Sequence, residues 1–238
     1  TGATQNVTVV VTDNSGNADS CTSVITVQDT ISPIIACKDT TIYLDATGTV
    51  SIDPGFIDNG SSDNCGLNLT LSQTTFGCDD VGINTVTLYA TDDNGNTDSC
   101  TANVTVLDTI IPTLTCQPHT GYLNSSGTVT IDTTGLLSSY NDNCGVANVE
   151  ISGSSTTTFD CTHIGSIQNV TVIVTDNSGN ADSCISVIIV QDTITPVIAC
   201  KDTTVYLDAT GFASIDSSFI DNGSSNNCGL RLSLSQTT

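Results

Sequence analysis

The amino-acid sequence predicts an all-β protein built from tandem β-sandwich repeats of about 80 residues. Two observations carry this prediction: the amino-acid usage and an internal repetition. The chain contains no Met and no Trp, and Thr, Ser, Val, Ile, Asn and Gly dominate it. This usage is typical of strands joined by tight turns. Hydrophobic residues make up 37% of the chain and recur in alternating runs, which disfavours disorder.

The repetition is visible at two scales. Residues 1–75 align without a gap to residues 164–238, with 59 identities in 75 positions. The offset of 163 contains two shorter units, because related runs close at Cys21, Cys100 and Cys184. Repeats of this kind stack as separate modules along a chain. The predicted organisation is the closing part of a repeat at 1–30, complete repeats at 31–109 and 110–193, and the opening part of a repeat at 194–238.

The two partial repeats would each leave an apolar face uncovered, because a few strands alone do not form a stable sandwich. We therefore expect the sequence to be an excerpt of a longer polymer, or a subunit whose ends are completed by neighbouring copies of the same protein.

Alternation of apolar and polar residues predicts the strands themselves. Val7, Val9 and Val11 alternate with Thr and Val, and the runs 86–90 and 102–106 alternate in the same way. Asp-Asn-Ser-Gly-Asn and Asp-Asp-Asn-Gly-Asn stand between two such runs, and Gly supplies the positive φ that a hairpin turn requires. A unit of about seven short strands fits a β-sandwich.

The charge excludes several partners. The chain has 3 Lys and Arg against 25 Asp and Glu, with a formal charge of −22 and a pI near 4.1. Nothing here could neutralise phosphates, so we expect no nucleic-acid partner and no binding to an anionic membrane surface. The sequence also contains no run of 18 apolar residues, so this segment is not expected to span a bilayer.

Three motifs carry a family resemblance. Asp-Thr-Ile-x-Pro precedes each repeat's first Cys, Asp-Asn-Cys-Gly occurs at 63–66 and 142–145, and Val-Thr-Asp-Asn-Ser-Gly-Asn precedes a closing Cys. In these motifs the chain resembles HYR (hyalin repeat) modules over essentially its whole length. The resemblance implies immunoglobulin-like extracellular domains in a linear array, as in adhesins and large bacterial surface proteins.

The 11 cysteines favour an oxidising compartment, so we expect an extracellular or cell-surface protein with disulfides. Four cysteines in each complete repeat allow three connectivities. The midpoints of the pairs Cys65–Cys78 and Cys144–Cys161 both fall near a turn, the second within 151–155, which predicts bonds across hairpins. The remaining cysteines then pair as Cys37–Cys100 and Cys116–Cys184. Zinc binding by thiolates is the alternative, and it is disfavoured because no Cys-x-x-Cys occurs and the two His are not repeated.

The aspartates suggest calcium. In an immunoglobulin-like sandwich, two loops and the incoming linker meet at one end, and acidic residues gathered there would repel one another unless a hard cation binds them. The alternative is that Asp and Asn only shape turns, and Asn226 replaces the acid found at Asp63. The candidate ligands are Asp29, Asp58, Asp63, Asp92 and Asp98 at the first junction, Asp108, Asp142, Asp176 and Asp182 at the second, and Asp192 and Asp221 at the third.

Glycosylation is a further expectation. The sequence contains seven Asn-x-Ser/Thr sequons, although a chain so rich in these residues also forms them by chance. Several Asp-Thr pairs resemble a bacterial O-glycosylation motif. The preferred sites are Asn6, Asn103 and Asn169 in strands and Thr30, Thr109 and Thr193 in linkers.

Among function classes, an enzyme is the least favoured. His119 and His163 occur in one repeat type only, and no motif supplies a nucleophile or a paired acid and base. We expect no catalytic residues. The sequence favours a structural stalk or filament that contacts neighbouring copies or repeats of itself. An adhesin that binds a glycan or a cell-surface partner is the alternative, but aromatic residues are only 4% and scattered, as at Tyr43, Tyr122 and Tyr206.

Overall fold

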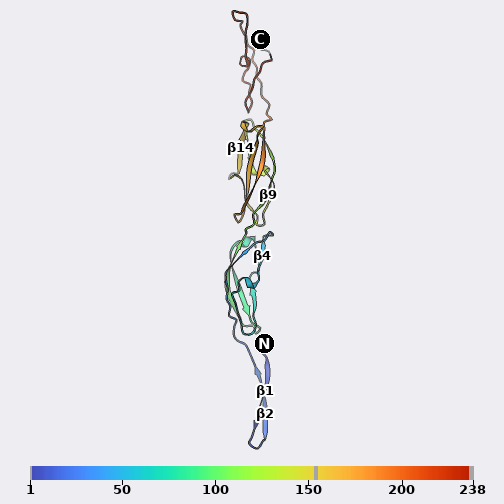
Figure 1. Ribbon diagram of the computed structural model, residues 1–238, viewed down its shortest axis with the longest axis vertical. Helices are drawn as coiled ribbons and strands as arrows, with labels where there is room; N and C mark the ends of the chain where they lie inside the picture. Colours follow the sequence, from blue (N-terminus) through green and yellow to red (C-terminus); the bar gives the residue numbers. More distant parts are fainter. Residues whose placement is uncertain (1, 153–154, 236–238) are drawn as a thin grey trace. The chain divides into compact units, whose positions relative to one another are not determined.

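The computed structural model describes residues 2–152 and 155–235, and the chain separates into two compact units, Thr1–Ile110 and Ile111–Thr238. Both units consist of strands with a few single turns of 3₁₀ helix (Figure 1). In the described part of the chain, no helix has the length and apolar character that crossing a membrane would need. The predicted fold class is therefore confirmed: the chain is all-β, with sandwich-like sheets.

The first unit contains three sheets. A two-stranded antiparallel sheet pairs β1 (Thr4–Thr12) with β2 (Ala18–Thr26). The largest sheet has the order β3 (Thr40–Tyr43), β8 (Thr97–Leu107), β7 (Gly82–Thr91) and β5 (Asn68–Leu71). The third sheet pairs β4 (Thr49–Ser51) with β6 (Thr75–Gly77). The 3₁₀ turns are η1 (Pro54–Phe56) and η2 (Cys78–Asp80).

The second unit repeats this plan. Its largest sheet has the order β10 (His119–Tyr122), β16 (Ala181–Gln191), β15 (Ile167–Asp176) and β13 (Val146–Ile151). Two smaller sheets pair β11 (Thr128–Asp132) with β14 (Thr156–Asp160), and β9 (Thr113–Cys116) with β12 (Leu137–Asn141). The 3₁₀ turns are η3 (Thr133–Gly135), η4 (Cys161–His163) and η5 (Ser217–Phe219). The pairs β3/β8 and β10/β16 are parallel.

The core follows from the alternation in the sequence. Val86, Leu88 and Ala90 of β7 are completely buried, while the residues between them face outward. Phe76 on β6 is 1% exposed and fills the space on the inner side of the smaller sheet. The second unit buries Val172 and Val174 of β15 in the same way. Each complete repeat therefore has an apolar interior between its sheets.

The partial repeats are built differently. The apolar side chains of β1 and β2 remain exposed, with Val9 at 55% and Val11 at 68%. The described residues from 194 onward contain η5 and two isolated bridges, Val197–Ser225 and Cys200–Asp221. Apolar side chains there are also exposed, such as Phe212 at 72%. The residues aligned with Val9 and Val11 in a complete repeat are Val172 and Val174, and both are completely buried, so the same apolar pattern is covered there.

Candidate functional sites at the repeat junctions

Two disulfides lie within the complete repeats. One joins Cys37 to Cys100 and the other joins Cys116 to Cys184, with Cα–Cα distances of 6.1 and 5.8 Å. Both are the pairs expected from the sequence. Each ties the opening segment of a repeat to its last strand, β8 or β16, and so closes the sandwich covalently.

The two predicted hairpin bonds are wrong. Cys65 has a free, exposed thiol, which rules out the Cys65–Cys78 pair. Cys161 is bonded to Cys228 and not to Cys144. The midpoint argument assumed that partners lie within one repeat, and part of the turn that supported it, residues 153–154, lies outside the described residues. Cys161 instead faces a loop of the following repeat.

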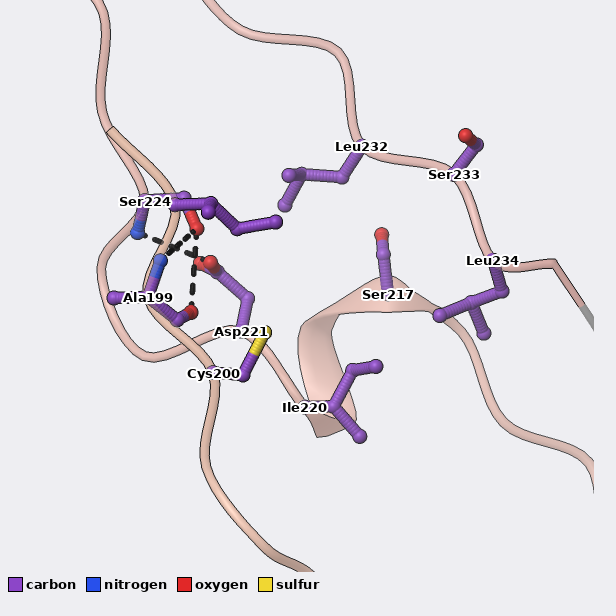
Figure 2. Close-up of a pocket in the computed structure, with 10 residues that line it drawn as sticks. Ala199, Cys200, Ser217, Ile220, Asp221, Ser224, Leu232, Ser233 and Leu234 are labelled. Carbon is purple, nitrogen blue, oxygen red and sulfur yellow. Dashed lines mark hydrogen bonds between the residues drawn. The ribbon is translucent and has the colours of Figure 1, made fainter. Parts of the chain in front are cut away.

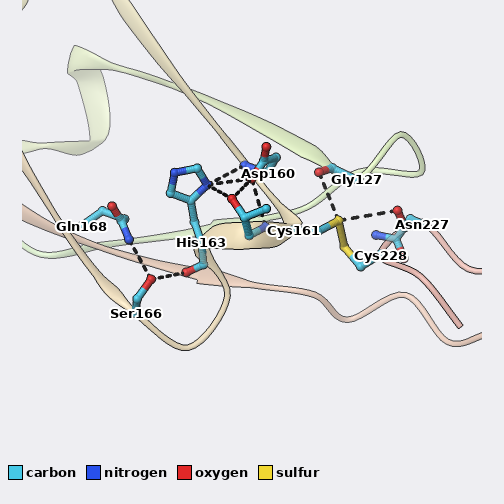
Figure 3. A network of polar contacts seen from close by, with 9 residues as sticks. Gly127, Asp160, Cys161, His163, Ser166, Gln168, Asn227 and Cys228 are labelled. Atoms are coloured by element: carbon cyan, nitrogen blue, oxygen red, sulfur yellow. Dashed lines mark hydrogen bonds and ion pairs between the residues drawn. A yellow bond between two sulfur atoms is a disulfide. The ribbon is translucent and has the colours of Figure 1, made fainter. Parts of the chain in front are cut away.

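The Cys161–Cys228 bond links two consecutive repeats (Figure 3). Its Cα–Cα distance is 5.3 Å and its sequence separation is 67, so the bond spans the closing strands β15 and β16, the linker and the opening segment of the next repeat. Because a disulfide stabilises mainly by restricting the unfolded chain, closing a loop of this length is worth about 4 kcal/mol in the chain-entropy account. The junction is therefore held covalently in addition to the peptide linker.

Polar contacts surround this bond. The Asn227 amide donates from Nδ2 to the carbonyl oxygen of Asn124, at 3.2 Å, and to Oδ1 of Asp192 in the linker, at 3.0 Å. A Cβ on Gly127 would lie 2.7 Å from the Asn227 carbonyl oxygen, and the φ of Gly127 is +75°. Glycine is therefore needed at this turn both for its backbone conformation and for the close approach of the next repeat.

A capped turn holds Cys161 in position. Asp160 caps η4, and its Oδ1 accepts from the backbone N–H of Thr162 at 3.0 Å and contacts Nδ1 of His163 at 2.8 Å. Hydrogen bonds from the Thr162 hydroxyl and then from its backbone N–H lower the pKa of the Asp160 carboxyl. The His163 ring packs edge-on against Phe159, with centroids 5.3 Å apart. His163 belongs to no catalytic or metal-binding motif of the sequence, and in the structure it is part of the cap of η4.

Three aspartates meet at a junction in the first unit. Asp29 lies in the linker after β2, Asp63 in the loop before β5, and Asp92 in the turn after β7. One carboxylate oxygen from each lies within 4.8 Å of the other two. Three negative charges at this separation repel one another unless a cation offsets them.

Backbone and amide donors hold these carboxylates in place. Asp92 is 5% exposed, and its Oδ1 accepts from the backbone N–H groups of Asn94 and Asn96, at 2.9 and 2.7 Å. Burial alone would raise the pKa of Asp92, but the hydrogen bonds from Asn96 and its neighbours outweigh burial and lower it. Asp63 accepts from the backbone N–H of Cys65 at 2.7 Å. These hydrogen bonds therefore fix the positions of the two side chains within their turns.

Asp29 completes the cluster with an unsatisfied oxygen. Its Oδ1 accepts from the backbone N–H of Ile31 at 3.0 Å, and this bond is the main cause of its lowered pKa. Its Oδ2 is buried and has no partner in good hydrogen-bond geometry in the described structure, although the Cys65 thiol and the Asn64 and Asn94 side chains are close enough to lower the pKa of this carboxyl. A buried, unpaired carboxylate oxygen is costly. Hard carboxylate oxygens fit calcium, which takes several oxygen ligands, and so the residues present are suited to that ion.

Two predicted ligands of the first junction lie elsewhere. The Asp58 carboxylate accepts from the backbone N–H of Ser61 at 3.0 Å, and hydrogen bonds from Ser61, first from its side chain, lower its pKa. Asp98 lies on the exposed face of β8 and accepts from the backbone N–H of Ser99. Both acids therefore shape the local backbone, as the turn alternative expects.

The remaining candidate acids range from buried to exposed, and each accepts a hydrogen bond from a nearby backbone N–H. In the first unit Asp108 is 6% exposed and accepts from the N–H of Ile110 at 3.1 Å. In the second unit Asp176 is 2% exposed and accepts from the N–H groups of Ser178 and Asn180, both at 2.8 Å. The others each accept from a nearby backbone N–H: Asp142 from Cys144, Asp182 from Ser183, Asp192 from Ile194, and Asp221 from Ser224.

Asp142 shares one feature with Asp29. Its Oδ1 is buried and accepts no hydrogen bond in the described structure, while Oδ2 takes the N–H of Cys144 at 2.8 Å. At Asn226, which occupies the same place in the third junction, the side-chain oxygen accepts from Cys228 and Nδ2 donates to the Ile194 carbonyl. Both polar atoms of the Asn226 side chain therefore have hydrogen-bond partners, whereas Oδ1 of Asp142 has none among the described residues.

The expected glycosylation sites are accessible. All six side chains are exposed: Thr30, Thr109, Thr193, Asn6, Asn103 and Asn169.

Comparison with known proteins agrees with the architecture. A family model described as the HYR domain matches residues 28–106. This stretch of the chain is similar to the HYR domain. This match covers the first complete repeat, which holds the Cys37–Cys100 bond and two of the three clustered acids.

A longer protein is similar over most of the chain. Hyalin from Strongylocentrotus purpuratus is 31% identical over 233 residues, which is 92% of this chain. The chain spans only 19% of the length of Hyalin. The comparisons give no support to the bacterial origin that the resemblance implied.

Solved structures of tandem extracellular modules are also similar at low identity. A protocadherin gammaB7 EC3-6 cis-dimer structure is 15% identical, with a TM-score of 0.35, over 90% of this chain and 64% of that one. The Sidekick-1 immunoglobulin domains 1-4 are 10% identical, with a TM-score of 0.37, over 76% of this chain and 57% of that one.

Proposed function

We propose that this protein is a structural extracellular protein, a stalk or filament of tandem HYR-like modules, and that its work is mechanical and not catalytic. The observation that supports this proposal is the Cys161–Cys228 bond, which cross-links one repeat to the next. A binding domain or an enzyme does not need a covalent bond across a module junction. In a protein that transmits tension, such a bond carries load when the noncovalent contacts of the linker fail.

An extracellular location agrees with this role. Disulfides persist in oxidising compartments and are rare in the cytosol. The expected partners are neighbouring repeats or copies of the same protein. Stretching the full chain with and without a reductant tests the role: a chain whose extension does not depend on the disulfides would not be the proposed load-bearing element.

We also propose that calcium stiffens the linkers. Asp29, Asp63 and Asp92 would supply the carboxylate ligands at the first junction. The buried free oxygen of Asp29 supports this, since a bound cation would satisfy it. A cation that binds residues of the linker, a loop and a hairpin turn at once would restrain the three segments relative to one another.

The expected result of removing one ligand charge is a weaker calcium response. Asp63→Asn keeps the size of the side chain and copies the natural Asn226. Since calcium affinity depends on the number of charged ligands, we expect roughly tenfold weaker binding at this junction. The measurement is hydrogen exchange of residues 63–66 and 92–96 in the full chain, stripped of calcium and then titrated with it.

The matched control is Asp98→Asn, an exposed acid outside the cluster. It should retain the full protection that calcium gives to these residues. If the unsubstituted chain shows no calcium-dependent protection, or if both variants lose it equally, calcium binding at this site is rejected.

Glycans are the last part of the proposal. Exposure of the six preferred Asn and Thr side chains permits attachment. Modification of the native protein would raise its intact mass above the peptide mass, and an intact mass equal to that of the peptide would exclude it.

A further inference from the structure

Among the described residues, three cysteines have free thiols: Cys21, Cys65 and Cys200. The counterparts of Cys21 and Cys200 form the bonds Cys37–Cys100 and Cys116–Cys184, each within one repeat. Cys65 differs from them because one of its counterparts is bonded to another repeat. Its counterparts in the following repeats are Cys144 and Cys228, and both are disulfide-bonded. The position therefore belongs to a bonding pattern that the chain uses elsewhere.

The loop that carries Cys65 has the same local geometry as the loop that carries Cys228. The backbone N–H of Ala36 donates to Ser61 Oγ at 3.1 Å, and that of Ala199 donates to Ser224 Oγ at 2.9 Å (Figure 2). In both loops the glycine after the cysteine has a positive φ, +95° at Gly66 and +91° at Gly229.

The cysteine itself is held in the same way in both loops. The Cys65 N–H donates to Asp63 Oδ2 at 2.7 Å, and the Cys228 N–H donates to Asn226 Oδ1 at 3.1 Å. Cys65 therefore lies in a loop of the same local structure as the loop whose cysteine, Cys228, forms a disulfide.

The position of Cys161, the partner of Cys228, indicates where a partner of Cys65 would lie. Cys161 lies in η4 at the end of β14, directly before the closing strands β15 and β16 of the preceding repeat. The segment 164–193, which contains these strands, aligns with residues 1–30, and these residues precede the repeat that contains Cys65. The order of closing hairpin, linker and cysteine loop is therefore the same in both places.

We propose that Cys65 is the acceptor of an inter-repeat disulfide and that its partner is the Cys161 counterpart of an adjacent repeat of the 110–193 type. The pairing depends only on the repeat order, so its failure would leave the mechanical role of Cys161–Cys228 intact.

The bond forms by two thiol–disulfide exchanges with a small disulfide such as oxidised glutathione. The Cys65 thiolate first displaces one glutathione thiolate and forms a mixed disulfide. The partner cysteine thiolate then attacks the Cys65 sulfur and displaces the second glutathione. One protein S–S bond forms, the glutathione S–S bond breaks, and the two protons end on the two glutathione thiols.

A tandem chain tests the proposal. Residues 1–163 are placed directly before residue 1 of a second complete chain, which continues the natural repeat register. Cys65→Ser in the first segment leaves one Cys65 to follow. After oxidative refolding in glutathione buffer, alkylation and digestion at aspartates, mass spectrometry should find this Cys65 bonded to Cys161 of the first segment and protected from alkylation.

The matched variant adds Cys161→Ser in the first segment. Cys65 should then be alkylated, while the Cys161–Cys228 bond of the second segment should remain and report correct folding. Alkylation of Cys65 in the tandem chain, or its bonding to any other cysteine, would overturn the proposal. The 238-residue chain alone should stay monomeric on a non-reducing gel, and a dimer linked through Cys65 would instead identify a second copy as the partner.

Discussion

When the oxidised chain is held at residue 111 and pulled at its C-terminal end, the segment from Cys116 to Cys228 should lengthen as though it had only 23 extensible residues. The bonds Cys116–Cys184 and Cys161–Cys228 overlap along the sequence. The shortest covalent path enters at Cys116, crosses to Cys184, runs back to Cys161 and crosses to Cys228. At about 3.4 Å per residue this path extends to about 80 Å, whereas the 112 residues of the reduced segment extend to about 380 Å.

Force spectroscopy before and after addition of a reductant measures the difference. Cys228→Ser should lengthen the oxidised path to the 44 residues from Cys184 to position 228, which is about 150 Å. Cys200→Ser, which removes a free thiol, should leave the extension unchanged. If the Cys228→Ser chain and the unsubstituted chain extend equally, the bond between repeats does not carry load.

The strands and the core could be predicted because their signals are local. Alternating Val, Leu and Ala along β7 determines which face is buried, and the glycines at the hairpin turns have the positive φ that the sequence predicts. The exposed valines of β1 obey the same pattern, and their exposure depends on which strands cover them. Burial is a tertiary property, so the pattern of one strand shows the apolar face but not whether a partner covers it.

The disulfides show where sequence spacing is insufficient. Pairing Cys37 with Cys100 needs only that the opening segment and the last strand of one sandwich are neighbours. Pairing Cys161 with Cys228 needs the orientation of one repeat against the next, which no spacing within a repeat contains. The signal that could have indicated it is Gly127, because a glycine with positive φ in a turn permits the close approach of the following repeat.

The acid cluster was predictable only in part. The topology of a sandwich brings the linker, one loop and one hairpin turn together, and the structure gathers Asp29, Asp63 and Asp92 from these three segments. Asp58 and Asp98 lie on the same loop and hairpin, but their carboxylates bind nearby backbone N–H groups. The direction of a side chain within a loop depends on local hydrogen bonds, which sequence proximity does not reveal.

Replacing Phe76 with alanine should remove a large part of the stability of the first complete repeat. Phe76 lies on β6 opposite Val50 of β4 and is 1% exposed, so its removal leaves a large cavity between the sheets. Truncation of a buried Phe costs about 3–5 kcal/mol. A small domain has a free energy of unfolding of about 5–15 kcal/mol. For a repeat of this size the loss corresponds to a fall in melting temperature of roughly 15–30 °C.

Phe56→Ala is the matched control, because Phe56 belongs to the same repeat but is 42% exposed in η1. Most of its surface is already in water, so the transfer and cavity terms are both small and we expect a loss below about 1 kcal/mol. Since the chain has no Trp to report unfolding, hydrogen exchange of β8 should be followed during denaturation. Equal effects of the two substitutions would mean that the smaller sheet, β4 and β6, does not cover the core. The two-sheet sandwich described for this repeat would then be wrong.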